Sequence, residues 1–172
     1  MTNDDGKAHW FVAYVRSCCE KKCAQMLAEY GYECYLPVQK EWRQWSDRRK
    51  LVDKPLLPRM IFVHCTRPER VKSMELVPYL SGYITLDGPY TPAIVRDDDM
   101  ERFRRFVECS GRSVTITRET LAPGDRVRVM DGPLEGIECE LVSVSGTRCL
   151  ATKVGLLGNA YVELTRESLK KI

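Results

Sequence analysis

Histidine is scarce in this chain of 172 residues, and the patterns that usually accompany catalysis are missing. His9 and His64 are the only two, and both lie in stretches that are predicted strands, where packing is the usual role. A phosphate-binding loop needs glycines and a lysine at fixed spacing, and Gly155 and Gly158 lack both the lysine and the spacing. The acidic residues are spread over predicted helix faces. We therefore expect a protein without enzymatic activity.

Cysteine is frequent, but no two cysteines form a Cys-x-x-Cys pair. The eight cysteines are Cys18, Cys19, Cys23, Cys34, Cys65, Cys109, Cys139 and Cys149. Most of them lie in apolar or periodic stretches, where a free cysteine packs as a small hydrophobic residue. A reducing compartment keeps such residues as thiols, and a chain of this length does not need a disulfide framework to fold. We expect free thiols.

A zinc site and a cysteine nucleophile are the alternatives that these residues leave open. The zinc ligands would be Cys18, Cys19 and Cys23 with His9 or His64. Their spacing fits no known zinc module, so we expect neither a metal nor a cofactor. A nucleophilic pair would combine His64 with Cys34 or Cys65, and no feature of the sequence favours it.

Long apolar runs are also absent. No uninterrupted run approaches the roughly 18 residues that a membrane-spanning helix requires. Residues 1–8 are polar and lack the apolar core of a secretory signal peptide. We expect a cytoplasmic protein that makes no contact with a membrane.

The positive charge of the chain is small in total and concentrated in one segment. The formal net charge at pH 7 is +3, and the length suits one medium domain or two small ones. Residues 38–60 contain more basic than acidic side chains. The basic ones are Lys40, Arg43, Arg48, Arg49, Lys50, Lys54 and Arg59, and the acidic ones are Glu41, Asp47 and Asp53. A local excess of this kind favours a nucleic-acid partner.

The apolar run at 57–63, Leu-Pro-Arg-Met-Ile-Phe-Val, directly follows the basic segment. Side chains alternate along a strand, so Met60 and Phe62 should point to one face and Ile61 and Val63 to the other. A strand that is apolar on both faces is covered on both. The chain's own helices can supply one cover and a partner the other. The alternative is that all four residues are ordinary core.

Apolar spacing predicts alternating strands and helices in the N-terminal part. Strands are expected at 9–15, 33–38, 57–65 and 83–86, and helices at 18–30, between Pro68 and Pro78, and at 97–109. Ser17 and Glu20 have the capping-box spacing at the first helix. The second helix would bury Val71, Met74 and Val77. The order β-α-β-β-α-β-α is that of a split βαβ, ferredoxin-like arrangement, so we predict an α+β fold with an antiparallel sheet.

The polar segment at 39–53 predicts a β-ribbon with a turn at Ser46 and Asp47. Trp42 and Trp45 lie there among basic residues, so the tip of the ribbon could stack bases and pair with phosphates. The alternative is a solvated hairpin with two half-buried tryptophans.

The C-terminal part has a different pattern. Residues 110–122 lose the helical period and are expected to be a linker. Short strands with tight turns follow from Pro123 onward and predict a small closed barrel. Leu156 and Leu157, between two glycines, form an apolar loop tip that either faces a partner or plugs one end of the barrel.

Several motifs together resemble those of the NusG family of transcription elongation factors. The N-terminal part contains Trp-Phe-Val at 10–12, Glu-Lys-Lys at 20–22, Tyr-Leu-Pro at 35–37 and the run at 57–63. The C-terminal part resembles a KOW domain through Pro-Gly-Asp-Arg-Val-Arg-Val at 123–129, Asp-Gly-Pro-Leu at 131–134 and Gly136. The resemblance implies a NusG N-terminal (NGN) domain at 1–109, a linker at 110–122 and an SH3-like KOW β-barrel at 123–172.

This resemblance implies a mechanism that depends on binding RNA polymerase. In the family, the N-terminal domain binds the clamp-helix coiled coil of the largest catalytic subunit. Its other side approaches the second large subunit, so that it bridges the cleft and reduces pausing. By position, Tyr14, Met60 and Phe62 match the hydrophobic pocket that receives the coiled coil. We expect the chain to act as a monomer.

The resemblance also implies contacts with nucleic acid and with a further protein. Arg16, Lys21 and Lys22 match the region that meets the exposed non-template DNA strand in specialised members. Together with this region, the ribbon would contact that strand or nascent RNA through Arg43, Trp45, Arg48, Arg49 and Lys50. Leu156 and Leu157 match the partner-facing loop of the KOW domain, which usually recruits a ribosomal protein or the termination factor Rho.

Within the family, the chain is most similar to the specialised antiterminators of the UpxY type, which act on capsular and other surface-polysaccharide operons. The similarity lies in residues 43–50, which lead into 55–58, and in Gly-Leu-Leu at 155–157. Housekeeping members usually have glycine and tyrosine where this chain has Arg59 and Met60. The alternatives are a housekeeping NusG-like elongation factor and a stand-alone RNA-binding or ribosome-associated KOW protein.

Overall fold

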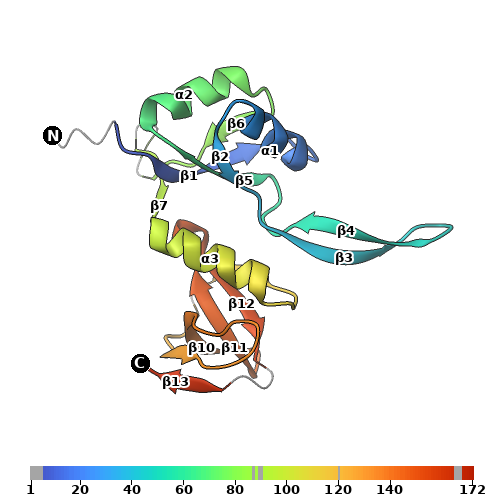
Figure 1. Cartoon of the computed structure of the whole chain (residues 1–172), viewed down its shortest axis with the longest axis vertical. Coiled ribbons are helices and arrows are strands. Elements are labelled where there is room, and N and C mark those ends of the chain that lie inside the picture. Colours follow the sequence, from blue (N-terminus) through green and yellow to red (C-terminus); the bar gives the residue numbers. More distant parts are fainter. Residues whose placement is uncertain (1–5, 87, 89–90, 120, 165–167) are drawn as a thin grey trace. The chain divides into compact units, whose positions relative to one another are not determined.

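The computed structural model describes residues 6–86, 88, 91–119, 121–164 and 168–172. The chain divides into two compact units. Unit 1 contains Met1–Pro37 and Leu57–Asp97, and unit 2 contains Val38–Leu56 and Asp98–Ile172 (Figure 1). No helix among the described residues is long and apolar enough to cross a membrane.

Unit 1 is built on an antiparallel sheet in the order β2-β5-β1-β6, with β7 also paired to β1 (Figure 1). Its strands are β1 (His9–Val15), β2 (Glu33–Tyr35), β5 (Met60–Cys65), β6 (Leu80–Tyr83) and β7 (Ile94–Val95). This order confirms the predicted split βαβ arrangement, in which the third strand of the motif lies between the first and the second. The two apolar strands, β1 and β5, therefore lie side by side in the middle of the sheet.

Unit 1 also contains two helices, α1 (Glu20–Glu29) and α2 (Arg67–Leu76). The core contains the odd-numbered residues of both central strands, together with residues of α1 and of the segment after α2. These buried residues are Phe11, Ala13, Val15, Cys23, Leu27, Ile61, Val63, Cys65, Val77 and Leu80. Burying each large apolar side chain contributes roughly 1.5–3 kcal/mol, so this layer contributes substantially to the stability of unit 1.

The predicted capping box at the start of α1 is wrong. A turn closed by the Cys19 N–H and the Arg16 carbonyl, at 3.1 Å, precedes the helix, so its N-cap is Cys19 and not Ser17. Cys19 makes no side-chain capping bond. The carboxylate of Glu20 instead accepts a hydrogen bond from the backbone N–H of Arg59 at 2.9 Å. Because the chain turns before the helix, Glu20 bonds to Arg59, which is distant in the sequence, and not to a neighbouring cap residue.

A full capping box is present at α2. Thr66 is the N-cap, its hydroxyl accepts the Glu69 N–H, and the Glu69 carboxylate accepts the Thr66 N–H at 2.8 Å. These hydrogen bonds stabilise the ionised carboxylate and hold the pKa of Glu69 below its ordinary value. Pro68 lies in the first turn, as predicted. Val71 does not join the core as predicted, because it is exposed and Ser73 is the buried residue of this helix.

Other strands of unit 1 also differ from the prediction. The strand expected at 33–38 is shorter, because β2 ends at Tyr35. The strand expected at 83–86 is β6 (Leu80–Tyr83), which begins three residues earlier, and β7 was not predicted because two residues carry no period. The strand expected from 57 begins at Met60, because Arg59 has a left-handed φ of 61° that interrupts the extended chain.

Unit 2 contains α3, a two-stranded ribbon and a six-stranded sheet. Helix α3 (Asp97–Cys109) has the predicted bounds and buries Met100, Phe103 and Phe106. The ribbon consists of β3 (Val38–Gln44) and β4 (Arg49–Pro55), as predicted. The tryptophans of this segment, Trp42 and Trp45, are exposed and not half-buried.

The six-stranded antiparallel sheet has the order β13-β9-β10-β11-β12-β8, as expected for a small SH3-like barrel. Its strands are β8 (Thr115–Thr117), β9 (Asp125–Val129), β10 (Glu138–Val144), β11 (Thr147–Lys153), β12 (Asn159–Glu163) and β13 (Leu169–Lys171). Strand β8 lies inside the segment that was expected to be a linker, and it pairs with β12. Gly124 is required next to this sheet, because a Cβ atom there would lie 1.9 Å from the Leu141 carbonyl oxygen.

We predict that Phe62→Ala lowers the free energy of unfolding by about 3–5 kcal/mol, because it leaves a cavity where a fully buried side chain lay in the middle of β5. Tyr14→Ala, on the neighbouring strand but 42% exposed, should cost about 1 kcal/mol. Urea titration of the full chain, followed by circular dichroism, measures both changes. Equal losses for the two variants would contradict the burial of Phe62.

Candidate functional site

The three residues predicted to bind polymerase share one face of the central strands. Tyr14 pairs with Met60, and Phe62 lies opposite Val12, so all three point away from the core formed with α1. They differ in exposure: Tyr14 is 42% exposed, whereas Met60 and Phe62 are buried. The centroids of the Tyr35 and Phe62 rings are 6.3 Å apart. Of the three predicted side chains, only Tyr14 is therefore left exposed, and its contact with a partner stays a prediction.

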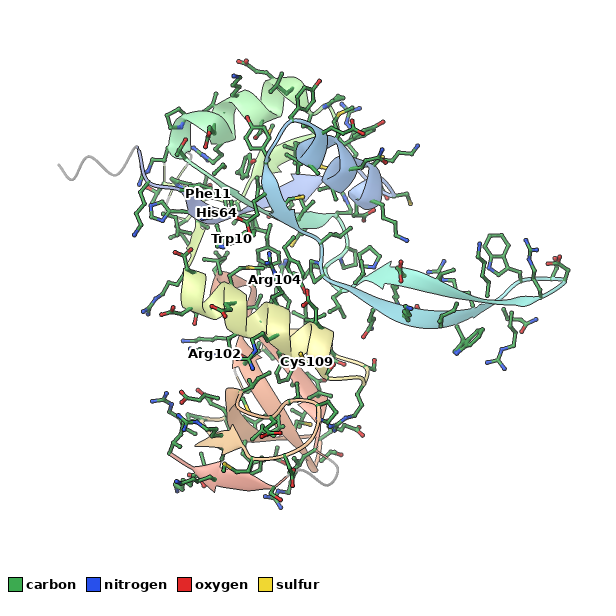
Figure 2. The ribbon with its side chains drawn as sticks, in the orientation of Figure 1. Trp10, Phe11, His64, Arg102, Arg104 and Cys109 are labelled. Atoms are coloured by element: carbon green, nitrogen blue, oxygen red, sulfur yellow. The ribbon has the colours of Figure 1, made fainter. Side chains whose placement is uncertain are left out.

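The two histidines are held by packing and polar contacts. The His64 ring stacks on Trp10 with 5.0 Å between ring centroids, and its Nδ1 lies 3.0 Å from the Glu33 carboxylate (Figure 2). The His9 and Phe11 rings lie edge to face, with 6.3 Å between their centroids. Both imidazoles therefore have structural neighbours, in line with the packed role that the sequence suggested.

The buried cysteines are poorly suited to act as nucleophiles. Burial raises the pKa of the Cys23 and Cys65 thiols to about 12, so both are protonated at neutral pH. The alternative pair of Cys65 with His64 therefore lacks a thiolate. Among the described residues, no group of three or more His, Cys, Asp or Glu side chains could hold a metal ion.

Four basic residues belong to one corner of unit 1, where β1 ends and α1 and β5 begin. We call Arg16, Lys21, Lys22 and Arg59 the basic corner, and all four side chains are exposed. Two hydrogen bonds bring the backbone of Arg59 to this corner: its carbonyl accepts the Val15 N–H at 2.8 Å, and its N–H donates to Glu20 at 2.9 Å. These clustered cations can attract phosphate groups.

Arg59 is the member of the basic corner that the sequence did not reveal. Its left-handed backbone, with φ of 61°, disfavours a residue with a Cβ atom by roughly 1–2 kcal/mol. The bonds to Val15 and Glu20 hold this conformation. The available signal was an arginine at a position where the resembling family usually has glycine.

The β3–β4 ribbon divides its side chains between two faces. Because directly paired residues point to the same side, Trp42 and Leu51 share one face with Arg49, and Arg43 and Lys50 share the other. The Arg49 guanidinium lies 5.7 Å from the Trp42 ring centroid. Trp45 lies in the turn beyond β3, and its backbone N–H donates to the Arg48 carbonyl at 2.8 Å. The residues predicted to bind nucleic acid are thus on one ribbon but not on one surface.

The apolar loop of the six-stranded sheet is also divided. It forms a single 3₁₀ turn, Gly155–Leu157, between β11 and β12. Leu156 is 41% exposed, whereas Leu157 is 2% exposed. Leu157 therefore lies in the interior, as the second interpretation predicted. Leu156 is exposed, and its contact with a partner stays a prediction.

The family model "Transcription termination factor nusG" matches residues 8–104, which is more than half of the chain. The chain belongs to the NusG family. The matched segment contains every residue of the basic corner and of the ribbon, as well as Tyr14, Met60 and Phe62.

One solved structure supports the same fold. "Domain interaction in Thermotoga maritima NusG" matches with a TM-score of 0.52 and 18% identity, covering 96% of this chain and 98% of that one. Two conformations of the "MjSpt4:Spt5 complex" match at 16% identity with TM-scores of 0.31 and 0.33. They cover 90% and 91% of this chain and 98% and 99% of those, and at these scores they carry no structural argument. No curated protein sequence matches the chain.

We predict that Arg59→Gly leaves the free energy of unfolding unchanged or raises it by up to about 1 kcal/mol. Glycine adopts a left-handed φ without the steric cost, which offsets its greater freedom in the unfolded chain. Urea unfolding of both proteins gives the comparison. A loss of more than about 1 kcal/mol would mean that the Arg59 side chain itself stabilises unit 1.

We also predict that stability falls as the pH rises above about 9. In the unfolded chain the thiols of Cys23 and Cys65 ionise near their ordinary value of 9.0, whereas in the fold their pKa is about 12. Between these values the unfolded state binds fewer protons, so alkali favours unfolding. Unfolding measured from pH 8 upward should show a shallower decline in the Cys23→Ala, Cys65→Ala double variant. An identical decline in both proteins would contradict this origin.

Proposed function

We propose that this NusG-family chain is a transcription elongation and antitermination factor that binds RNA polymerase through unit 1. The observation that carries the proposal is the family match over 8–104, which includes the sheet face where Tyr14 is exposed. Tyr14 would contact the clamp helices of the largest subunit, and Met60 and Phe62 lie beside it on the same face. The second large subunit would be approached by the opposite side of the domain.

The proposed mechanism is preferential binding to one state of the polymerase. A factor that contacts both sides of the cleft favours the closed clamp over the open one. It can shift this equilibrium only by the difference between its affinities for the two states. Pausing and termination would decrease because both require the clamp to loosen, and no bond is made or broken by the factor.

Nucleic acid would contribute a second contact. The basic corner and the ribbon are both exposed and rich in cations, which suits the phosphates of the non-template strand or of nascent RNA. The proposed contact residues are Arg16, Lys21, Lys22, Arg43, Trp45, Arg48, Arg49 and Lys50, together with Arg59. A strand held by these residues would give the factor a preference for particular transcripts.

We further propose that the factor is specific for surface-polysaccharide operons, as in the UpxY type. Its NGN domain would occupy 1–109 and its KOW domain 123–172. Leu156 is the exposed apolar residue through which the KOW domain would recruit a ribosomal protein or Rho. The support for this specialisation is the similarity of residues 43–50 and 155–157 described above.

The test is an electrophoretic shift of paused elongation complexes assembled with the cognate polymerase. Tyr14→Asp should weaken binding roughly 10- to 100-fold, since burying one such side chain contributes about 1.5–3 kcal/mol. Tyr14 suits this test because it is exposed, whereas a charge at buried Phe62 would disrupt the fold. Tyr30→Asp, an exposed tyrosine at the end of α1, is the matched control and should bind normally.

The same assay separates the functional classes. If neither the parent chain nor the Tyr30 control shifts any elongation complex, the elongation-factor proposal is wrong. If the shift occurs on every transcript alike, the chain is a general factor. A shift that depends on the leader sequence of a polysaccharide operon supports the specialised function.

A further inference from the structure

Two apolar side chains on one face of the β3–β4 ribbon, Trp42 and Leu51, have no role in the function proposed above. Trp42 exposes 61% of its surface, and its cross-strand partner Leu51 exposes 40%. Large apolar side chains that are exposed side by side mark a contact surface more often than isolated ones do. Both side chains belong to a separate sheet of only two strands, β3 and β4.

Trp42 is held in place by a cation. The Arg49 guanidinium lies 5.7 Å from the centroid of the Trp42 ring, within the range of a cation–π contact. This contact restricts the indole before any ligand arrives, which lowers the entropy cost of binding. The ring nevertheless keeps most of its area accessible, so a planar group can still stack on it.

The charge of the ribbon indicates the kind of ligand. Between residues 38 and 55 there are six basic and three acidic residues, a net charge of +3 that equals the net charge of the whole chain. Lys54 already neutralises Glu41 at 3.1 Å. Arg43 and Lys50 are directly opposite each other, although like charges in such pairs are destabilising, and neither forms an ion pair with a described residue. This arrangement favours a polyanion.

The size of the apolar area favours a base over a protein. A stable protein interface buries roughly 800 Å² on each partner, far more than two side chains on a narrow ribbon provide. A single base needs only one aromatic ring, and stacking on it contributes without regard to base identity. In a duplex both faces of each base are already stacked, so only an unpaired base can reach Trp42.

We propose that Trp42 is a stacking platform for an unpaired base of a single nucleic-acid strand. Arg49 lies on the same face of the ribbon and contacts the phosphate beside that base, whereas Lys40 on this face lies directly opposite Asp53. This inference rests on the proposed nucleic-acid contact and deepens it, because it specifies single strands and adds Trp42, which stacks through its ring, to the cations that bind phosphate.

The experiment measures fluorescence anisotropy of labelled thymidine strands of about 12 nucleotides with the full chain. Trp42→Leu keeps apolar bulk but removes the ring, and it should lower affinity roughly 5- to 100-fold. Trp42→Phe keeps a ring and should retain most of the affinity. The slope of affinity against salt should be the same in all three proteins, because the phosphate contacts remain.

Matched ligands separate stacking from charge. An abasic strand of the same length has the same phosphates but no bases, so Trp42→Leu should not change its affinity. The same holds for a duplex. Comparing a uridine RNA strand with the thymidine DNA strand shows which nucleic acid Trp42 binds. An equal loss of affinity for the two strands means that Trp42 stacks on bases of either, and a loss for one strand alone identifies that nucleic acid as the ligand.

Three results would overturn the inference: no effect of Trp42→Leu on thymidine or uridine strands, an equal loss on abasic strands, or a loss confined to binding of the polymerase complex, which would mark a protein contact. The proposed function fails separately. If the parent chain shows the Trp42-dependent stacking but shifts no elongation complex, the stacking stands and the elongation-factor function does not.

Discussion

The pairing of β1 with β5 is the constraint on which the rest of unit 1 depends. Both strands are apolar on both faces, and their register places Val12 opposite Phe62 and Tyr14 opposite Met60. Apart from His9 at the start of β1, the odd-numbered residues then enter the core with α1, and the even-numbered residues lie on the other face. A slip of one residue would exchange the two sets, so the same register fixes both the core and the position of the exposed tyrosine.

The elements that could be predicted from the sequence are those with a long and distinct pattern. Strand β1 is a continuous apolar run, the ribbon is a polar segment around a turn signal, and α3 has an apolar stripe at helical spacing; each appears where expected. Short elements without a period were missed: β7 has two residues, and β8 consists of Thr-Ile-Thr within a polar segment. The cap of α1 was missed for another reason, because Glu20 is bonded to Arg59, 39 positions away.

The candidate site was predictable in its residue types but not in its surfaces. The cluster of arginines and tryptophans was visible in the sequence, but only the register of β3 and β4 separates Arg49 from Arg43. Arg59 joins the basic corner through backbone hydrogen bonds to Val15 and Glu20 that no spacing rule indicates. The burial of Phe62 depends on what lies over the second face of the sheet, and an apolar strand alone does not specify that.

The isolation of β3 and β4 in a sheet of their own has a consequence for solubility. Both strands are edges, and each presents backbone N–H and C=O groups that another extended chain could pair with. Charged side chains on such edges repel further strands and so prevent aggregation. The lysines and arginines of this ribbon therefore protect the free protein from self-association while no anion is bound. A ribbon with fewer lysines and arginines would need another feature, such as a proline on an edge strand, to prevent pairing between the edges of different molecules.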